Sequence, residues 1–313
     1  MIEIFFGWVI IEMGGHINII KSDQISVVRL DVGGNILGGI AAGIILFNPD
    51  LLRLKENIEA IYQQVELLVL IDNNSNNIEV IEREYGLYEN IFFIKNKDNF
   101  GIAKALNQAM RFCQSKGYAW VLTLDQDSVC PSNLIQEYHK YVEIPKVAII
   151  SPIINDRNMR ESSTVKHSAD DFEEIKKCIT SATLTNVKIW ESIGGFDEMM
   201  FIDLVDFEYC KRILQNGFKI LRVNTVILLH EVGRITQPKF LFWDLIILNH
   251  SPFRKYYISR NLIYVAKKHR TYGGIVMAYL RAIKLLLQTE VYEKDKIKKG
   301  MAILRGMKSG RKL

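Results

Sequence analysis

The chain has 313 residues, of which 49% are hydrophobic and 24% are charged, a composition that excludes a disordered protein and provides a core for one large domain, alone or with a smaller appendage. Its net charge of +5 is unevenly distributed: residues 251–313 contain 16 Lys and Arg against 3 Asp and Glu, which leaves −8 on residues 1–250. We therefore expect the two regions to bind different partners.

The cysteines and the first residues indicate a cellular location. Four cysteines lie far apart, without a CxxC pair or zinc-like spacing, which predicts reduced thiols in a cytosolic protein. The apolar start lacks the basic segment of a secretory signal, and no stretch reaches the roughly 18 uninterrupted apolar residues of a spanning helix. We expect a protein made and kept in the cytoplasm.

Residues 1–38 precede the regular pattern and show no clear period. Their glycine-rich patch at 33–39 contains neither G-x-G-x-x-G nor the lysine of a phosphate-binding loop. We interpret residues 1–38 as an N-terminal extension.

Strands and helices alternate from residue 39 onward. Short apolar runs predict strands, and apolar residues that recur every three or four positions predict helices. The predicted strands are 40–47, 67–71, 91–94, 118–124 and 147–154, and the predicted helices are 51–65, 78–85 and 101–114. Strands that are apolar throughout are typical of a sheet with helices on both faces. The pattern predicts an α/β fold with a doubly wound, mostly parallel sheet.

The regular alternation ends after Pro152. Residues 156–177 are highly charged and predict a surface excursion, while 182–189, 219–223 and 226–229 are interpreted as further strands. Beyond residue 237 the chain is helical and basic in pattern. We therefore expect a catalytic domain at 39–236 and a helical appendage at 237–313.

Polar loops follow four of the predicted strands. They read NPD, DNNSNN, NKDNFG and DQDS. Ligands of open α/β sheets bind beyond the carboxyl ends of the strands, so these loops are expected to meet in one crevice.

The DQDS loop contains two carboxylates, Asp125 and Asp127, at the end of an apolar strand. Residues i and i+2 of a strand point to the same side, and two carboxylates that close repel each other unless a cation neutralises them. Mg²⁺ or Mn²⁺ is the natural cation, held by one or two carboxylates together with substrate phosphates. The alternative is a solvated turn, which the position beside three other polar loops disfavours.

The ordered motifs resemble those of family 2 glycosyltransferases with the A-type fold, and the chain looks most like the bacterial rhamnosyltransferase subgroup. The resemblance covers residues 39–261. It rests on motifs that follow in order: FNP, DNNS, NFGIAKALN, WVLTLDQDS, IGGFDE and FIDLVDFE.

The resemblance implies a donor site. Asp72 matches the aspartate that contacts the nucleobase, and Phe47 and Asn48 match residues of the same pocket, whereas Asp72 could instead cap the following helix. Asn99 and Gly101 match the turn beneath the nucleotide. The metal-binding residues that the resemblance implies are Asp125 and Asp127, completed by His230. The alternative for His230 is a histidine packed in the core.

The resemblance also implies an acceptor side, matched by Gly195, Phe196, Asp197 and Glu198. Inversion requires a base on the acceptor hydroxyl. The family often supplies it from an acidic residue at the position of Leu204, so we expect Asp203 as the base and Asp206 as the second candidate. Asp206 could instead form a buried charge network with Glu208 and Arg212.

The basic tail carries an Arg260–Asn261 pair that resembles a recurrent feature of these transferases. An apolar helix at 274–288 within so basic a region predicts a membrane-surface element, and ordinary packing with solvated lysines is the alternative. A polyprenyl-diphosphate-linked acceptor at the inner face of the cell membrane would suit such a tail. Nucleic acid is not expected, because no recognition motif is present.

The leading hypothesis is a metal-dependent, inverting transferase that moves a sugar, L-rhamnose from dTDP-L-rhamnose, to a saccharide or lipid-linked acceptor in bacterial surface polysaccharide synthesis. A second hypothesis is a sugar-phosphate nucleotidyltransferase. It is disfavoured because FNPDLLRLKEN lacks the glycines found in the first loop of such enzymes. The third is a catalytically silent, membrane-associated scaffold, against which the intact DQD and GGFDE motifs argue.

Overall fold

The computed structural model describes residues 39–156, 170–230, 247–270 and 272–313, with residues 156, 230 and 272 by their backbone alone. It also gives the backbone of short strands within residues 2–37 and 239–244. Five paired strands lie near the N-terminus and one pair near residue 240; their bounds are β1 Ile2–Phe5, β2 Trp8–Met13, β3 His16–Lys21, β4 Arg29–Leu30, β5 Ile36–Leu37, β14 Lys239–Phe240 and β15 Trp243–Asp244. None of these pairs with the central sheet.

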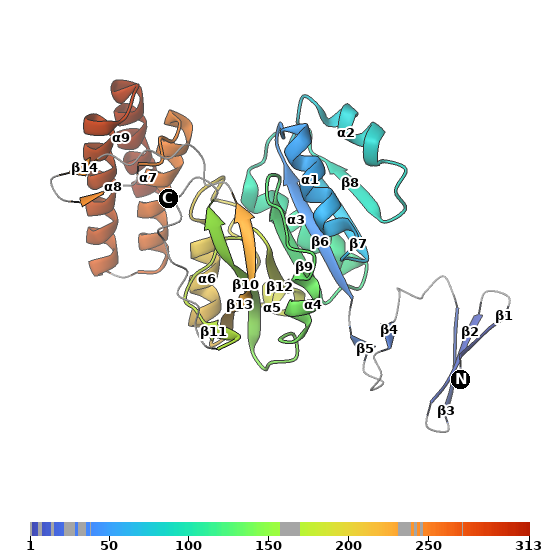
Figure 1. Cartoon of the computed structure of the whole chain (residues 1–313). Coiled ribbons are helices and arrows are strands. Elements are labelled where there is room, and N and C mark those ends of the chain that lie inside the picture. Colours follow the sequence, from blue (N-terminus) through green and yellow to red (C-terminus); the bar gives the residue numbers. More distant parts are fainter. Residues whose placement is uncertain are drawn as a thin grey trace.

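The central sheet has eight strands in the order β11-β13-β10-β12-β9-β6-β7-β8 (Figure 1). Only β11 and β12 run antiparallel to their neighbours. The strand bounds are β6 Ile40–Leu46, β7 Leu67–Asp72, β8 Ile91–Lys95, β9 Trp120–Asp125, β10 Val147–Asp156, β11 Phe172–Glu174, β12 Thr183–Asn186 and β13 Lys219–His230. The predicted mostly parallel α/β sheet is confirmed.

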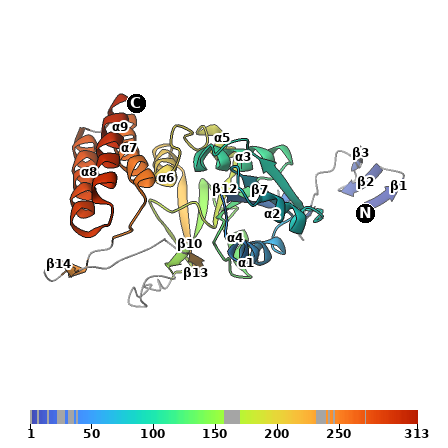
Figure 2. The same ribbon diagram turned by 90° about the horizontal axis from the view of Figure 1, so that it is seen from above.

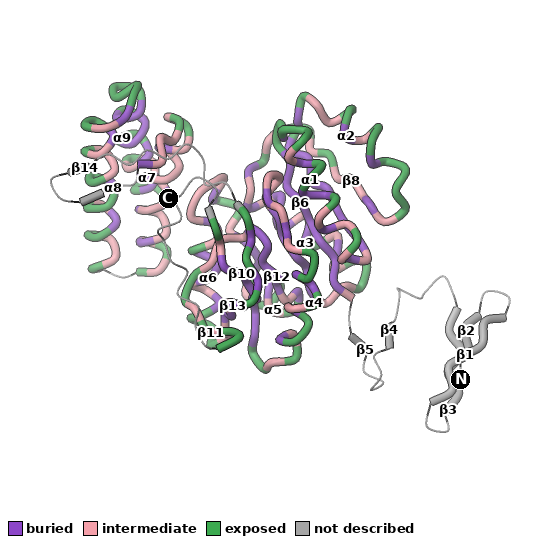
Figure 3. Tube along the Cα trace, viewed as in Figure 1, coloured by how far each residue is buried: buried purple, intermediate pink, exposed green. Residues whose placement is uncertain are grey.

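Helices cover both faces of this sheet (Figure 2). Alternate residues of β6 point to opposite faces: Ile44 packs in a core with α1, α2 and α4, and Ile45 packs in a second core with α3, α5 and α6. The helix bounds are α1 Leu51–Tyr62, α2 Ile78–Tyr85, α3 Ile102–Ser115, α4 Leu134–His139, α5 Val187–Ser192 and α6 Val205–Gln215. Figure 3 shows the buried residues concentrated along the central strands, as expected for a sheet with two covered faces.

Three of the predicted strands after residue 180 differ from the structure. The strand expected at 182–189 ends at Asn186, because the Asn186 side chain accepts the N–H of Ile189 and begins α5. The strands expected at 219–223 and 226–229 are one strand, β13, which bulges between Val223 and Ile227 where it pairs with β10. The segment expected as a surface excursion at 156–177 contributes the edge strand β11, and residues 157–169 lie outside the described residues.

The C-terminal region forms a bundle of three helices, α7 Pro252–Lys268, α8 Tyr272–Tyr292 and α9 Lys296–Lys312 (Figure 1). Gly306 lets α9 approach α7 closely: a Cβ atom there would lie 2.1 Å from Ser259 Oγ and 2.3 Å from the carbonyl oxygen of Tyr256. A buried ion cluster adds polar contacts, because Glu293 pairs with both Lys255 and Lys299. The predicted helical region is present, while its predicted start at residue 237 falls outside the described residues.

Two further properties concern the whole described chain. All four cysteines are free thiols. Among the described helices, none combines the length and apolar content that crossing a bilayer requires.

Candidate active site

The carboxyl ends of β6, β7 and β9 meet at one edge of the sheet. Ile45 of β6 lies opposite Asp125 of β9, and Leu46 lies opposite Asp72 of β7. The chain runs from β6 to β7 on one side, whereas β9 flanks β6 on the other, so this is the point where the strand order reverses. Ligand crevices of open α/β sheets form at such a point.

The loop after β6 is held by its neighbours. The N–H of Phe47 donates to Gln126 Oε1 at 2.9 Å, and the N–H of Asn48 donates to Ser75 Oγ at 2.8 Å. Asn48, in the left-handed region with φ of 47°, accepts the N–H of Asn76 through its side chain. These bonds leave the Phe47 ring 47% exposed at the edge of the crevice.

Asp72 shapes its own loop. Its carboxylate accepts the N–H groups of Asn74 and Ser75 at 3.1 Å, and its side chain is almost completely buried. The alternative that Asp72 caps the following helix is not what the structure shows, because Asn77 occupies the N-cap of α2. Asp72 therefore fixes the loop that follows β7 at the edge of the crevice.

Gly101 forms a tight turn before α3. It has φ of 84°, and its N–H donates to Asn99 Oδ1 at 2.9 Å. A Cβ atom at this position would lie 2.4 Å from the carbonyl oxygen of Phe201, which also accepts the N–H of Ile102 at 2.7 Å. Only glycine fits both the backbone conformation and this close approach.

Asp125 and Asp127 follow β9 as predicted. The N–H of Asp125 donates to Ser181 Oγ at 3.3 Å, and its carbonyl oxygen accepts Asn57 Nδ2 at 2.6 Å. The N–H of Val129 donates to the carbonyl oxygen of Leu229, which brings the end of β13 beside the DQD loop. The backbone of His230 follows directly, but its side chain lies outside the described residues.

The two carboxylates fit a cation that is shared with a ligand. The described residues contain no group of three or more His, Cys, Asp and Glu placed to hold a metal ion. A pair of carboxylates nevertheless matches the way Mg²⁺ is commonly bound, with substrate phosphates completing the coordination.

A second acidic segment leads into α6. Asp203 and Leu204 both have left-handed backbone conformations, with φ of 66° and 65°, immediately before α6. Two consecutive non-glycine residues in this region are strained. The side chain of Asn261, buried in α7, holds this turn by donating to the carbonyl oxygens of Ile202 and Asp203, each at 2.8 Å.

The two candidate bases have different surroundings. Asp203 pairs with Arg254 of α7, through Nη2 to Oδ1 at 2.5 Å and Nε to Oδ2 at 3.3 Å. Asp206 lies in the first turn of α6 and accepts the N–H of Phe207 at 2.8 Å. Burial, together with the negative charges of Asp125 and Asp203, raises the pKa of Asp206 to about 7. Asp206 is therefore close enough to Asp125 to experience its charge.

The GGFDE segment is held from three helices. Asn107 of α3 accepts the N–H of Phe196 at 2.8 Å and donates to its carbonyl oxygen and to Glu198 Oε1. Asp197 accepts from Tyr264 at 2.8 Å and from Lys268 at 2.6 Å, both on α7. The carboxylates of Asp197 and Glu198 thus anchor the segment, with Gly195 in the left-handed region at φ of 67°.

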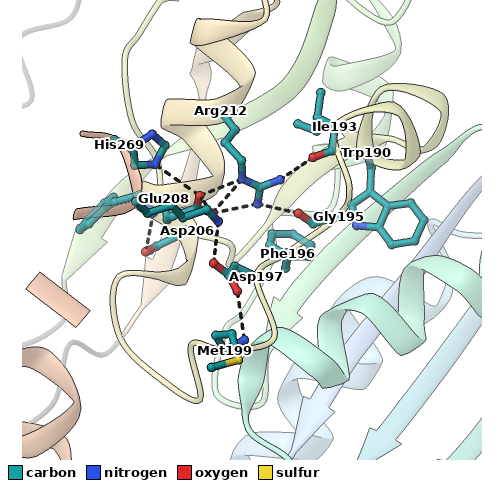
Figure 4. Close-up of polar contacts among 12 residues, drawn as sticks. Trp190, Ile193, Gly195, Phe196, Asp197, Met199, Asp206, Glu208, Arg212 and His269 are labelled. Atoms are coloured by element: carbon teal, nitrogen blue, oxygen red, sulfur yellow. Dashed lines mark hydrogen bonds and ion pairs between the residues drawn. The ribbon is translucent and has the colours of Figure 1, made fainter. Parts of the chain in front are cut away.

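Glu208 and Arg212 join α6 to this segment (Figure 4). The Arg212 guanidinium donates to both Glu208 oxygens and to the carbonyl oxygens of Ile193 and Gly195, the last two at 2.7 and 2.6 Å. Lys268 reaches Glu208 Oε1 at 2.8 Å. Burial alone would raise the pKa of Glu208, but Arg212 and Lys268 outweigh it and lower that pKa. The predicted network therefore exists for Glu208 and Arg212, and Asp206 is bonded elsewhere.

A cavity of about 470 Å³ lies beside the GGFDE segment and not at the DQD loop. Its walls include Asn107, Arg111, Glu198, Tyr264 and Lys268. This cavity lies between α3, α7 and the GGFDE segment and opens to solvent. The carboxylate pair at the point where the strand order reverses, and not the size of the hollow, identifies the candidate site.

Several supporting residues were not predicted. Asn96 links the ends of β7 and α3, because its side chain donates to Asn73 and exchanges hydrogen bonds with Gln108. Asn107, together with Gln108, is a polar residue within the otherwise apolar pattern of α3, a signal that could have indicated a buried contact. Asn261 was marked in the sequence as part of the Arg260–Asn261 pair. The backbone carbonyl groups that it binds could not be predicted from the sequence.

Comparison with known proteins now identifies the class. The family model "Glycosyl transferase family 2" matches residues 43–203, which is half of the chain. The protein belongs to glycosyltransferase family 2, and its fold is the A-type fold of that family.

Three relatives illustrate the similarity. The chain is 28% identical over 244 residues to the dTDP-rhamnosyl transferase RfbF of Shigella flexneri, covering 74% of this chain and 80% of that protein. The solved structure of GalNAc-T7 with UDP, GalNAc and Mn²⁺ superposes with a TM-score of 0.58 at 14% identity, over 88% of this chain and 56% of that one. S. aureus TarS 1–349 in complex with UDP-GlcNAc gives 0.58 at 11% identity, over 85% of this chain and 79% of that one.

Replacing Asn261 by Ala should destabilise the protein by about 1–3 kcal/mol, because two carbonyl groups of the strained turn lose their donor. Denaturant unfolding measures this loss. Asn216→Ala is the matched control, since Asn216 is an exposed amide that bonds within the end of α6. Equal unfolding midpoints for the two variants would contradict a role for Asn261 in holding the turn.

Proposed function

We propose that the protein is an inverting, metal-dependent glycosyltransferase that moves L-rhamnose from dTDP-L-rhamnose to a saccharide or lipid-linked acceptor in bacterial surface polysaccharide synthesis. The observation that carries the proposal is the carboxylate pair Asp125 and Asp127 at the point where the strand order reverses. The similarity to RfbF of Shigella flexneri supports dTDP-L-rhamnose as the donor.

The donor would lie along the loops after β6, β7 and β8. Phe47, Asn48 and Asp72 would line the base and ribose pocket, and the backbone at Asn99 and Gly101 would pass beneath the nucleotide. Asp125 and Asp127, with His230 as a third ligand, would hold Mg²⁺ or Mn²⁺. The cation would supply positive charge to the diphosphate leaving group. The Mn²⁺ in the GalNAc-T7 structure supports this choice of cofactor.

The acceptor would enter from the side of α6 and α7. We place the base at Asp206 first and Asp203 second, because Arg254 already engages both oxygens of Asp203. The carboxylate would take the proton of the acceptor hydroxyl while that oxygen attacks the anomeric carbon opposite the diphosphate, whose bond to the sugar breaks. Gly195, Phe196, Asp197 and Glu198 would support this side through their contacts with α3 and α7.

A panel of nucleotide sugars tests the donor. With Mn²⁺, dTDP-L-rhamnose should be consumed faster than the UDP- and GDP-sugars of the panel, and chelation of the metal should stop the reaction. Asp127→Ala should lower kcat/KM by on the order of 100-fold or more, because the leaving group loses its counter-charge. Glu143→Ala is the control, since Glu143 is an exposed acid that precedes β10 at the opposite edge of the sheet. Failure to bind any nucleoside diphosphate with Mn²⁺ would overturn the proposal.

We further propose that the basic C-terminal region holds the protein at an anionic membrane surface, where a polyprenyl-diphosphate-linked acceptor would lie. The outer face of α8 carries one apolar stripe whose side chains are 44–61% exposed: Val276, Leu280, Ile283, Leu287 and Val291. Exposed Arg281 and Lys284 flank it on the same helix. An apolar face bordered by basic residues is typical of interfacial helices, whereas pairing of two such faces would bring like charges together.

Vesicle sedimentation tests this surface. The protein should bind vesicles rich in anionic phospholipid, bind zwitterionic vesicles weakly, and be released by salt. The double variant Leu280→Gln, Leu287→Gln should weaken binding by about 10- to 100-fold, because two apolar side chains no longer enter the interface. Leu87→Gln serves as the control, since Leu87 is 93% exposed in the catalytic domain. Binding that depends on neither lipid charge nor the stripe would contradict the proposal.

A further inference from the structure

An aromatic cluster lies where the catalytic domain meets α7. It consists of Phe201, Phe253 and Tyr257. The rings of Phe201 and Tyr257 are stacked with centroids 5.1 Å apart and planes 23° apart, and Phe253 packs against them with centroid distances of 5.6 and 4.9 Å. The guanidinium of Arg260 lies 4.8 Å from the Tyr257 centroid. The cluster is therefore held in place by its own packing.

The cluster borders the reactive side of the crevice. Phe201 touches the turn beneath the nucleotide, because a Cβ atom at Gly101 would lie 2.8 Å from Phe201 Cδ2. Phe253 is the neighbour in sequence of Arg254, which pairs with Asp203. Phe201 therefore contacts the donor turn directly, and Phe253 reaches it through its packing on Phe201.

Phe253 is 52% exposed although it packs against Phe201 and Tyr257. Phe100, directly before the turn at Gly101, and Met199, whose carbonyl oxygen accepts from Arg260, are exposed by 37% and 52%. Apolar surface exposed beside charged residues is typical of ligand-binding surfaces.

The chemistry of the patch suits a sugar ring. One face of a pyranose presents C–H groups that pack on the electron-rich face of an aromatic ring, and its hydroxyl groups need charged or amide partners at the edge. The Asp203–Arg254 pair is close in the chain to two of the rings, because Asp203 lies two residues after Phe201 and Arg254 follows Phe253. The geometry points to a platform on which a saccharide acceptor stacks against Phe253, with its hydroxyl groups toward the Asp203–Arg254 pair. This inference rests on the proposed function, because it names the acceptor class of the same site.

Saturation-transfer NMR tests the platform, with methyl glycosides of common hexoses, hexosamines and 6-deoxyhexoses as probes. The wild-type protein should saturate the ring C–H protons of at least one glycoside. Phe253→Leu, which keeps apolar bulk without an aromatic face, should raise the dissociation constant of that glycoside about 5- to 10-fold, and Phe253→Tyr should preserve it. Tyr88→Ala is the control, since Tyr88 is an exposed aromatic residue against Tyr62 at the other end of the sheet.

The outcomes separate this inference from the proposed function. No saturation of any glycoside, an unchanged dissociation constant for Phe253→Leu, or saturation of the isoprenyl protons of farnesyl diphosphate in place of sugar protons would overturn the platform. Consumption of dTDP-L-rhamnose by the wild-type protein with Mn²⁺ is measured separately, without glycosides. If the wild type consumes no dTDP-L-rhamnose, the proposed function is overturned, whatever the glycosides show.

Discussion

Two hydrogen bonds from the side chain of Asn261 fix the backbone turn that leads into α6. Asp203 and Leu204 adopt left-handed conformations that cost free energy in non-glycine residues. The Asn261 amide holds their carbonyl groups from α7, and the turn then leads directly into α6, whose first turn carries Asp206. The position of Asp206 relative to Asp125 is therefore set by a helix of the C-terminal bundle, which completes the catalytic domain.

The same helix holds the neighbouring segments. Tyr264 and Lys268 bind Asp197, and Lys268 also reaches the buried carboxylate of Glu208. A buried carboxylate needs such partners, because an unpaired charge in this position would cost several kcal/mol. The acids of this protein thus fall into two groups. Asp197, Glu198 and Glu208 are paired and hold the structure together, whereas burial, with a contribution from the negative charge of Asp125, raises the pKa of Asp206.

Much of the fold was predictable because the central strands are buried on both faces. β6, β7 and β9 are continuous apolar runs that end in polar loops, so their place in a parallel sheet and the meeting of those loops followed from elementary rules. β13 was read as two strands because Asn224 and Thr225 interrupt its apolar run at a bulge, and local pattern does not reveal a bulge.

The site was predictable only in part. The DQD carboxylates stand at a strand end that the sequence marks plainly, but the side-chain partners of Asp197, Glu198 and Asp203 come from α3 and α7, far along the chain. Long-range contacts of this kind leave no periodic signal. The pairing of Asp203 with Arg254 changes the preferred base from Asp203 to Asp206. Composition and spacing could not predict this pairing, so the sequence alone could not distinguish the two candidates.

Sugar transfer by Asp206→Asn and Asp203→Asn tests this assignment most directly, with binding of the nucleoside diphosphate measured in parallel. Asp206→Asn should lower kcat by about 10²- to 10⁴-fold, the range expected when a general base is lost, and should leave nucleotide binding intact. Asp203→Asn should retain most of its turnover, because Asp203 acts by pairing with Arg254. Near-normal transfer by Asp206→Asn, with transfer lost in Asp203→Asn, would contradict the assignment of the base.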